Sequence, residues 1–406
     1  MLTVDLWLTR KPLSVTFVEY NRTHGGKYMA VDDPWQPFKE IVDTPMQHAR
    51  AWKEKSGCKI VGHLLPDVPD EIIHAAGALP VAIEGAGEGI SHAQAHIPSY
   101  SCAHSMGTLE MALKGELDIL DGMVIPYVCD TTRNLFHIWS IKFQGMKNEF
   151  LRLPKRLDFD GIRDYLSSEF SRLFDSMKEL TGVSSGKEQL TNSLKLYNQS
   201  RQKLRQAYQL HKNNPTLWTA ERVQILIGSA LRAPREEHLQ WMEALPWNER
   251  SKGEENERTP IYVHGKVWDP PEILGLFEEL KFLTVGDDLV TGYRYIEKDA
   301  PIDGDPIDGL VERHMTTIPY TGYHFSPEKM VQRFVERVQV SGAKGVLFLN
   351  PKFCEAAAFD TPDFQKGLEA QNIPSLILET STRGVSMGQI RIRLEALREM
   401  ISGDLP

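Results

Sequence analysis

The stretch KIVGHLLPDVPDEIIHAAGALPVAIEG, residues 59–85, decides the fold that this sequence predicts. KIVGHL is a short apolar run typical of a strand, and LPVAIEG is a second one. Between them, Pro69 suits the first turn of a helix and Gly77 suits its end. A strand, a helix and another strand in this order predict two parallel strands with a helix packed on one face.

The same alternation continues on both sides of a helical middle. GMVIPYVCD predicts a third strand and TTRNLFHIWSIKF a helix, and from Thr259 onward TPIYVHG, FLTVGDD, KGVLFLNPKFC and PSLILET predict further strands. We therefore expect an α/β protein with two doubly wound parallel-sheet domains of the flavodoxin or Rossmann type. The expected division is a helical lead-in at 1–57, a first α/β domain at 58–157, a helical segment with a charged linker at 158–258, and a second α/β domain at 259–406.

Composition excludes several classes of function. The 406 residues carry a net charge of −9 and their basic residues are dispersed, so we expect no nucleic-acid partner. No apolar run approaches the ~20 residues of a membrane span, and the N-terminus lacks a secretory signal pattern, so a cytoplasmic protein without membrane contact is expected. Four cysteines are too few for a disulfide framework, which leaves thiolate chemistry.

Three of the cysteines share a sequence setting. Cys102, Cys129 and Cys354 each lie at a break between a hydrophobic run and a predicted helix. Cys129 and Cys354 follow the carboxyl ends of predicted strands, which is where open α/β sheets bind ligands. Cys58 precedes its strand, on the opposite edge, and is interpreted as structural. No CxxC is present, so the spacing alone identifies no known metal site, and buried inert thiols remain the alternative to a shared metal site.

Other candidates are weaker. His104, two residues after Cys102, is a candidate catalytic residue, and Asp130 is expected to cap the helix that follows Cys129. The sequence has no GxxxxGK[ST], and GAGEGISH at 85–92 is interpreted as a turn. The segment DDLVTGYRY is either a surface turn or a loop lining a cleft. In the second case it supplies candidate substrate contacts at Asp287, Asp288, Tyr293 and Arg294.

Four stretches together resemble the family of 2-hydroxyacyl-CoA dehydratases and benzoyl-CoA reductases. They are PDVPDEIIHAAGALP, LDILDGMVIPYVCDTTRNLFHIW, DDLVTGYRY and FCEAAAFDTPDFQKGLEAQNIPSLILE, and the resemblance runs from about residue 45 to the C-terminus. It implies a 4Fe-4S cluster held by three cysteines per subunit, in a cleft between the two domains. Cys102, Cys129 and Cys354 match those three positions.

The resemblance also implies partners and a chemistry. It implies a heterodimer with a related cluster-bearing subunit, a separate ATP-hydrolysing iron–sulfur activator, and an acyl-CoA substrate that receives a low-potential electron. The block from Tyr100 to Trp139 favours an aromatic acyl-CoA reductase of the benzoyl-CoA type. A 2-hydroxyacyl-CoA dehydratase, which eliminates water through a ketyl radical, is the alternative.

Two further alternatives stay open: a non-catalytic subunit that only relays electrons, and a metal-free α/β binding protein. The sequence AHSMG after Cys102, and Leu64 and Leu65, depart from the family's usual residues. These departures put substrate contacts in doubt more than cluster binding.

Overall fold

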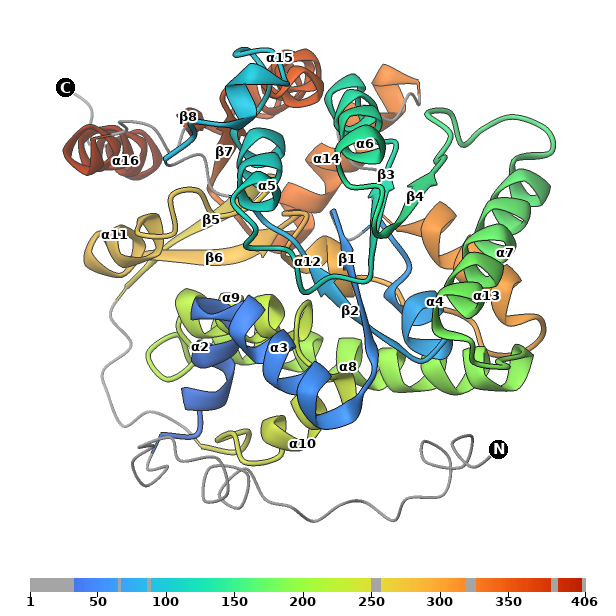
Figure 1. The fold of residues 1–406 in the computed structure, drawn as a ribbon. Helices are drawn as coiled ribbons and strands as arrows, with labels where there is room; N and C mark the ends of the chain where they lie inside the picture. The colour runs from blue at the N-terminus through green and yellow to red at the C-terminus, as the bar shows by residue number, and fades with distance from the viewer. Residues whose placement is uncertain are drawn as a thin grey trace.

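Two parallel β-sheets form the centre of the protein (Figure 1). The computed structural model describes residues 33–64, 67–85, 89–249, 257–317, 326–380 and 386–403. In the first sheet the order is β2-β1-β3-β4, and in the second it is β6-β5-β7-β8, with all the pairings described being parallel. The predicted fold class is confirmed. The strands are β1 Lys59–His63, β2 Ala78–Ala82, β3 Gly122–Pro126, β4 Lys147–Leu151, β5 Thr259–Gly265, β6 Phe282–Asp287, β7 Gly345–Pro351 and β8 Ser375–Thr380.

The two sheets have the same topology. In each, the first strand of the set lies between the second and the third, so the chain reverses its direction of winding beside that first strand. The point of reversal lies between β1 and β3 in one sheet and between β5 and β7 in the other. Connections diverge there at the carboxyl ends of the strands and leave room for a ligand. Cys129 follows β3 and Cys354 follows β7, so each sheet brings a cysteine to this edge.

Helices cover both faces of each sheet. Leu109 of α5 and Trp139 of α6 pack on one face of the first sheet, and Ile72 of α4 and Phe170 of α7 on the other. The second sheet lies between α11 and α16 on one side and α14 and α15 on the other. The helices named are α4 Asp70–Ala75, α5 Ala103–Leu113, α6 Asp130–Lys142, α7 Ile162–Thr181, α11 Ile273–Glu279, α14 Pro327–Ser341, α15 Glu355–Glu369 and α16 Met387–Ser402.

A helical layer runs alongside the sheets. Its core combines the N-terminal lead-in with the predicted helical middle, and Trp35, Phe38 and Ile41 of the lead-in are buried. Within the described ranges, every helix is too short or too polar to cross a lipid bilayer. The layer consists of α2 Gln36–Asp43, α3 Pro45–Ser56, α8 Lys187–Asn213, α9 Ala220–Ala230 and α10 Arg235–Met242, with α12 Tyr293–Ile296 and α13 Pro306–Thr316 beside it.

The structure differs from the sequence expectation at three elements. β4, with the sequence KNEFL, was not predicted, because it is short and carries Lys147 and Glu149 within five residues. The sequence predicts helices only at Thr108–Lys114 and over FQKGLEAQ, residues 364–371, whereas α5 and α15 begin earlier, each directly after a cysteine. Gly107 inside α5 and Pro362 inside α15 are residues that normally weaken or end a helix, and so both helices were predicted too short.

A fully buried set of charged residues joins the two sheets to the helical layer. Arg201 of α8 donates to Glu71 of α4 over 2.6 Å. Next to this pair, the Tyr295 hydroxyl donates to Asp70 over 2.8 Å and accepts from Arg235 over 2.6 Å. All five side chains are at most 3% exposed. Burial favours the neutral carboxyl, but the Arg201 guanidinium outweighs it and lowers the pKa of Glu71 to about 2.

Replacing Arg201 with Met should leave the Glu71 carboxylate buried without its partner and lower the free energy of unfolding by about 3–5 kcal/mol at pH 7. The lowered pKa means that this pair stabilises the fold above pH 4.5 and that its contribution is lost as the pH falls toward 2. Urea unfolding of the wild type and of R201M at pH 7 and at pH 3 measures both effects.

Two variants serve as controls for R201M. R205M removes a partly exposed arginine on the same helix, 2.9 Å from Asp299, and should cost less than about 1 kcal/mol. The double variant R201M/E71L removes both charges and should recover most of the lost stability. A double variant as unstable as R201M would contradict the role of unpaired charge.

Candidate functional site

The three predicted cysteines each cap a helix. Cys102, Cys129 and Cys354 are the N-cap residues of α5, α6 and α15, and all three have extended backbone conformations. The first turn of a helix leaves N–H groups without partners and carries a partial positive charge, which stabilises an anionic sulfur placed there. These three helices lie close together in the upper part of Figure 1 although they come from distant parts of the chain.

Two of the cysteines have a hydroxyl-bearing residue three positions later in the sequence. Three residues after Cys129, the Thr132 hydroxyl accepts from the Cys129 backbone N–H over 3.2 Å, which completes a capping box. Three residues after Cys102, the Ser105 hydroxyl lies 3.4 Å from the Cys102 sulfur. The expectation that Asp130 caps α6 was wrong, because Cys129 holds that position and Asp130 is the first helical residue. Sulfur is not among the usual N-cap acceptors, so capping rules pointed to the neighbouring carboxylate instead.

Cys354 lies near both of the other cysteines. Burial raises the pKa of the Cys354 thiol, and negative charge on Cys102 and Cys129 raises it further, whereas Lys266 opposes the rise. Among the described residues, no three His, Cys, Asp or Glu side chains are close enough to hold a single metal ion. The three thiols are therefore neighbours without forming a single-ion site.

The loop after β2 fixes the position of α5. A Cβ atom on Gly85 would lie 1.9 Å from the backbone nitrogen of Thr108, so only glycine allows this contact between the loop and the helix. Gly85 opens the segment GAGEGISH, whose residues 86–88 lie outside the described part of the chain. The contact with Gly85 fixes how closely α5 packs against the loop after β2, and hence the positions of Cys102 and His104 at the start of α5.

A lysine that the sequence analysis missed lies beside Cys129. The Lys155 ammonium donates to the Val128 carbonyl and lies 5.1 Å from the centre of the Tyr127 ring. Burial lowers the pKa of Lys155, while negative charge on Cys129 and Asp67 opposes this. A positive charge therefore stands next to the first turn of α6. Lys155 lies outside any predicted strand or motif, so no sequence signal marked it.

His104 faces an acid of the second domain. Its Nε2 atom lies 4.0 Å from Oδ2 of Asp269, in the segment after β5. Burial lowers the pKa of His104 well below its usual value, and the positive charge of Lys266 lowers it further. The Gly85 backbone opposes this shift, although neither ring nitrogen of His104 forms a hydrogen bond within the described residues. Burial, aided by Glu84, raises the pKa of Asp269 to about 6. Asp269 follows a predicted strand, so the rule that marked Cys129 and Cys354 could also have marked it.

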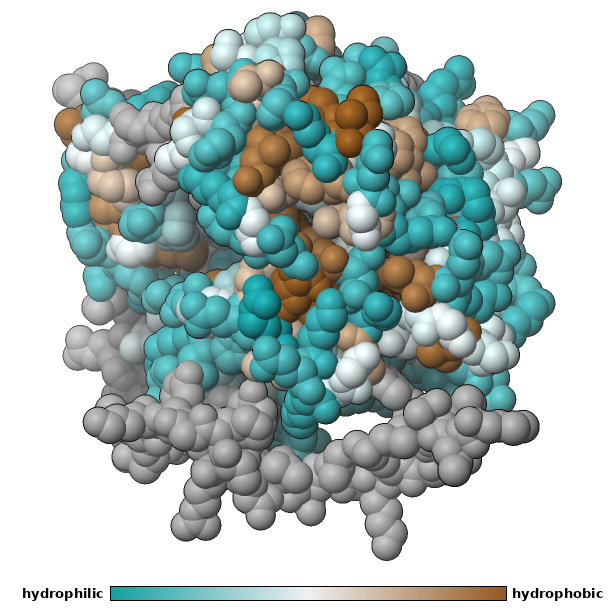
Figure 2. All heavy atoms as spheres, viewed as in Figure 1, coloured by the Kyte–Doolittle hydropathy of each residue, from teal (hydrophilic) through white to brown (hydrophobic). Residues whose placement is uncertain are grey.

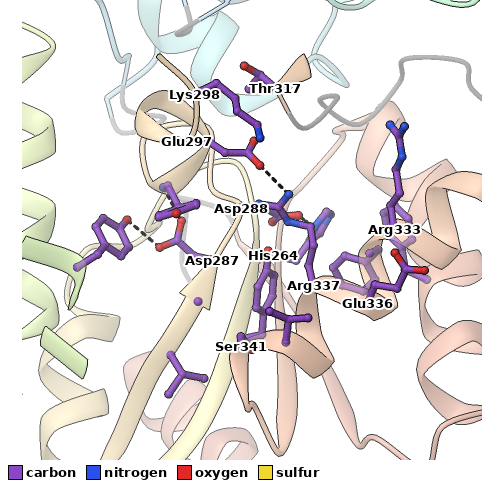
Figure 3. Close-up of a pocket in the computed structure, with 18 of the residues that line it drawn as sticks. His264, Asp287, Asp288, Glu297, Lys298, Thr317, Arg333, Glu336, Arg337 and Ser341 are labelled. Atoms are coloured by element: carbon purple, nitrogen blue, oxygen red, sulfur yellow. Dashed lines mark hydrogen bonds and ion pairs between the residues drawn. The ribbon is translucent and has the colours of Figure 1, made fainter. Parts of the chain in front are cut away.

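The acids of DDLVTGYRY do not form a surface turn. Asp287 and Asp288 are each 2% exposed and line a pocket of about 770 Å³ between β6, α8, α12 and α14 (Figure 3). Asp287 accepts from the Tyr208 hydroxyl over 2.8 Å, and Asp288 lies 2.8 Å from Nδ1 of His264. Burial raises the pKa of Asp287 to about 6, while His264 outweighs burial and lowers that of Asp288.

The other two predicted substrate contacts of this segment differ from each other. Tyr293 lines the same pocket as the two acids. Arg294 is buried and donates to the Asp288 carbonyl over 3.0 Å, so its guanidinium holds the loop. The structure thus separates two groups of predicted residues: the cysteines with His104, and the loop residues around the pocket.

Comparisons with known proteins point to one family. The family model described as 2-hydroxyglutaryl-CoA dehydratase, D-component, matches residues 67–401. A benzoyl-CoA reductase subunit of Thauera aromatica is 27% identical over 86% of this chain and 92% of its own. The (R)-phenyllactyl-CoA dehydratase beta subunit of Clostridium sporogenes is 26% identical over 91% and 99%. The beta subunit of (R)-2-hydroxyglutaryl-CoA dehydratase from Acidaminococcus fermentans is 24% identical over 92% and 100%.

Replacing Asp269 with Asn should make unfolding less dependent on pH. Because the pKa of Asp269 is raised to about 6, its contribution to stability is complete below pH 3.8 and is lost as the pH rises through 6. D269N should therefore match the wild type near pH 4 and exceed it by at most about 3 kcal/mol near pH 7.5. Denaturant unfolding at both pH values measures this difference.

The matched control is E272Q, because Glu272 is an exposed acid on the same segment. It should change stability little at either pH. An equal difference between D269N and the wild type at both pH values would contradict the raised pKa.

Proposed function

We propose that this chain, which belongs to the family of the 2-hydroxyglutaryl-CoA dehydratase D-component, is the iron–sulfur subunit of an acyl-CoA radical enzyme. The observation that carries the proposal is that three helix N-termini, each with a cysteine at the N-cap position, lie near one another. Cys354 lies within electrostatic reach of Cys102 and Cys129, as three ligands of one group must. Thiolates are the usual protein ligands of iron–sulfur clusters.

The residues present fit a 4Fe-4S cluster with three thiolate ligands. The three cysteines are grouped, and thiolates are the usual protein ligands of such clusters. Cys102 is 7% exposed, and the hydroxyls of Ser105 and Thr132 lie close to two of the sulfurs, so the chain shields these ligands and can hydrogen-bond to them. When bound, the cluster would supply one-electron transfer at low potential.

Positive charge near the thiolates is part of the same proposal. Lys155 stands beside Cys129, and Lys266 opposes the rise in the pKa of Cys354. Two ammonium groups and three helix N-termini together offset the negative charge of three thiolates. This arrangement supports a role in holding an anionic cofactor more than it supports three inert buried thiols.

The proposed reaction is ATP-driven reduction of an aromatic acyl-CoA of the benzoyl-CoA type, with 2-hydroxyacyl-CoA dehydration as the second candidate. A benzoyl-CoA reductase subunit and two dehydratase beta subunits are similar to this chain at 24–27% identity, so relatives support both. His104 is the proposed catalytic residue. The proposed substrate contacts remain Asp287, Asp288, Tyr293 and Arg294, three of which line the 770 Å³ pocket.

The proposed partners are a related cluster-bearing subunit and an ATP-hydrolysing iron–sulfur activator. The relatives are themselves named as subunits. Hydrophobic residues gather in the upper middle of the face in Figure 2, in the region of α5, α6 and α15. Ile141, Phe353 and Phe359 are 69%, 49% and 80% exposed, which is unusual for large apolar side chains and suits contact with another chain. A subunit that only relays electrons would use the same surface.

Replacing Cys102, Cys129 or Cys354 with Ser, one at a time, should remove most of the iron. Protein purified without oxygen and with its partner subunit should contain about four irons and four sulfides per chain in the wild type. The matched control is C58S, because Cys58 precedes β1 on the opposite edge of the first sheet and should be dispensable. Equal iron in C129S and C58S would refute the proposed site.

Reconstitution with the partner and the activator should separate the two reactions. A reductase should consume benzoyl-CoA and hydrolyse ATP with every electron, whereas a dehydratase should convert a 2-hydroxyacyl-CoA to its enoyl-CoA with ATP in catalytic amounts. Turnover of neither thioester by a protein that holds four irons would favour the electron-relay alternative.

A further inference from the structure

Asp269 is a buried acid without a partner for one of its oxygens. It is 3% exposed, and its Oδ2 atom has no hydrogen-bond partner among the residues that the structure describes. Nε2 of His104 lies 4.0 Å from Oδ2, which is beyond hydrogen-bond distance. A carboxylate in such a place lacks the solvation that a charge needs, and so burial favours the protonated acid. The geometry alone therefore makes Asp269 a group that gains a proton readily.

Burial and the charges around Asp269 bring its pKa close to neutral pH. Glu84, after β2, and Glu272, on its own segment, favour the protonated form. Lys266, also on its own segment, favours the carboxylate. His104, from α5, faces it across the boundary between the domains. Burial and these neighbours raise the pKa to about 6, so a modest change of nearby charge near pH 7 is enough to protonate it.

Asp269 also lies close to the proposed cluster ligands. Lys266 acts on Asp269, on His104 and on the Cys354 thiol, so these groups share one electrostatic environment. The Lys352 backbone N–H, two residues before Cys354, donates to the Thr380 carbonyl over 2.7 Å. The Thr380 side chain neighbours Asp269 in turn. Asp269 is therefore linked to the segment that carries Cys354 through Thr380, and it shares Lys266 with the Cys354 thiol.

We propose that Asp269 is a redox-linked proton acceptor. When one electron from the ATP-hydrolysing activator enters the cluster held by the three cysteines, one proton from solvent binds Oδ2 of Asp269. An O–H bond forms there, the cluster is the group reduced, and the net charge of the cleft stays constant. This inference rests on the proposed function and adds to it the residue that couples electron to proton.

The test is the midpoint potential of the cluster measured against pH from 5 to 8, by redox titration followed by electron paramagnetic resonance. The protein is purified without oxygen, with its partner. Above about pH 6 the wild-type potential should fall as the pH rises, because a tenfold loss of protons shifts a one-electron, one-proton equilibrium tenfold, or 59 mV. D269N should show no such dependence. E272Q removes a charge that favours the protonated acid, so it should keep the wild-type slope while the pH at which the potential begins to fall moves lower.

A second variant covers the case in which D269N fails to fold or to bind iron. K266M removes the charge that favours the Asp269 carboxylate, so the pH at which the potential begins to fall should rise. An unchanged onset in K266M, a wild-type slope in D269N, or a wild-type potential independent of pH would each overturn this inference while leaving a cluster in place. A wild-type protein without iron would instead overturn the proposed function, and this inference with it.

Discussion

The free energy cost of a buried charge governs how this protein is held together. Glu71 and Arg201 are almost completely excluded from solvent, and each is tolerable only because the other is 2.6 Å away. Glu71 belongs to α4 beside the first sheet, Arg201 to the helical layer, and the neighbouring Tyr295 to α12 beside the second sheet. A shift of one part against the others would separate these groups. The relative placement of the two sheets, and so of the cysteines that each contributes, depends on this set of contacts.

The overall architecture was predictable because strand and helix patterns in this sequence are strong and local. Apolar runs such as KGVLFLNP mark central strands that are buried on both faces, and parallel order follows from the helices between them. What could not be predicted depends on distant contacts. Gly107 inside α5 is tolerated because Gly85 packs against the same turn of that helix. The short strand β4 exists because β3 offers it a partner.

The candidate site also combines residues that local sequence patterns mark with residues that only distant contacts bring together. Cys129 and Cys354 were predicted as site residues because they follow strands, and such positions share one edge of a parallel sheet. Lys155 and the pairing of His104 with Asp269 were not found, because each is created by two segments far apart in the sequence. The capping role of the cysteines was missed for a chemical reason. Sulfur is rare at helix N-termini, where oxygen acceptors normally serve.

The positions of the three cysteines also have a consequence for how the protein is made. Cys102 and Cys129 both belong to the part of the chain that forms the first sheet. Cys354 lies 225 residues beyond Cys129. At the usual pace of a ribosome, this stretch takes roughly 10–45 s to synthesise. Through that interval the nascent chain has two thiols of the site and lacks the third. The site is thus completed only near the end of translation, when the first sheet has already had time to fold.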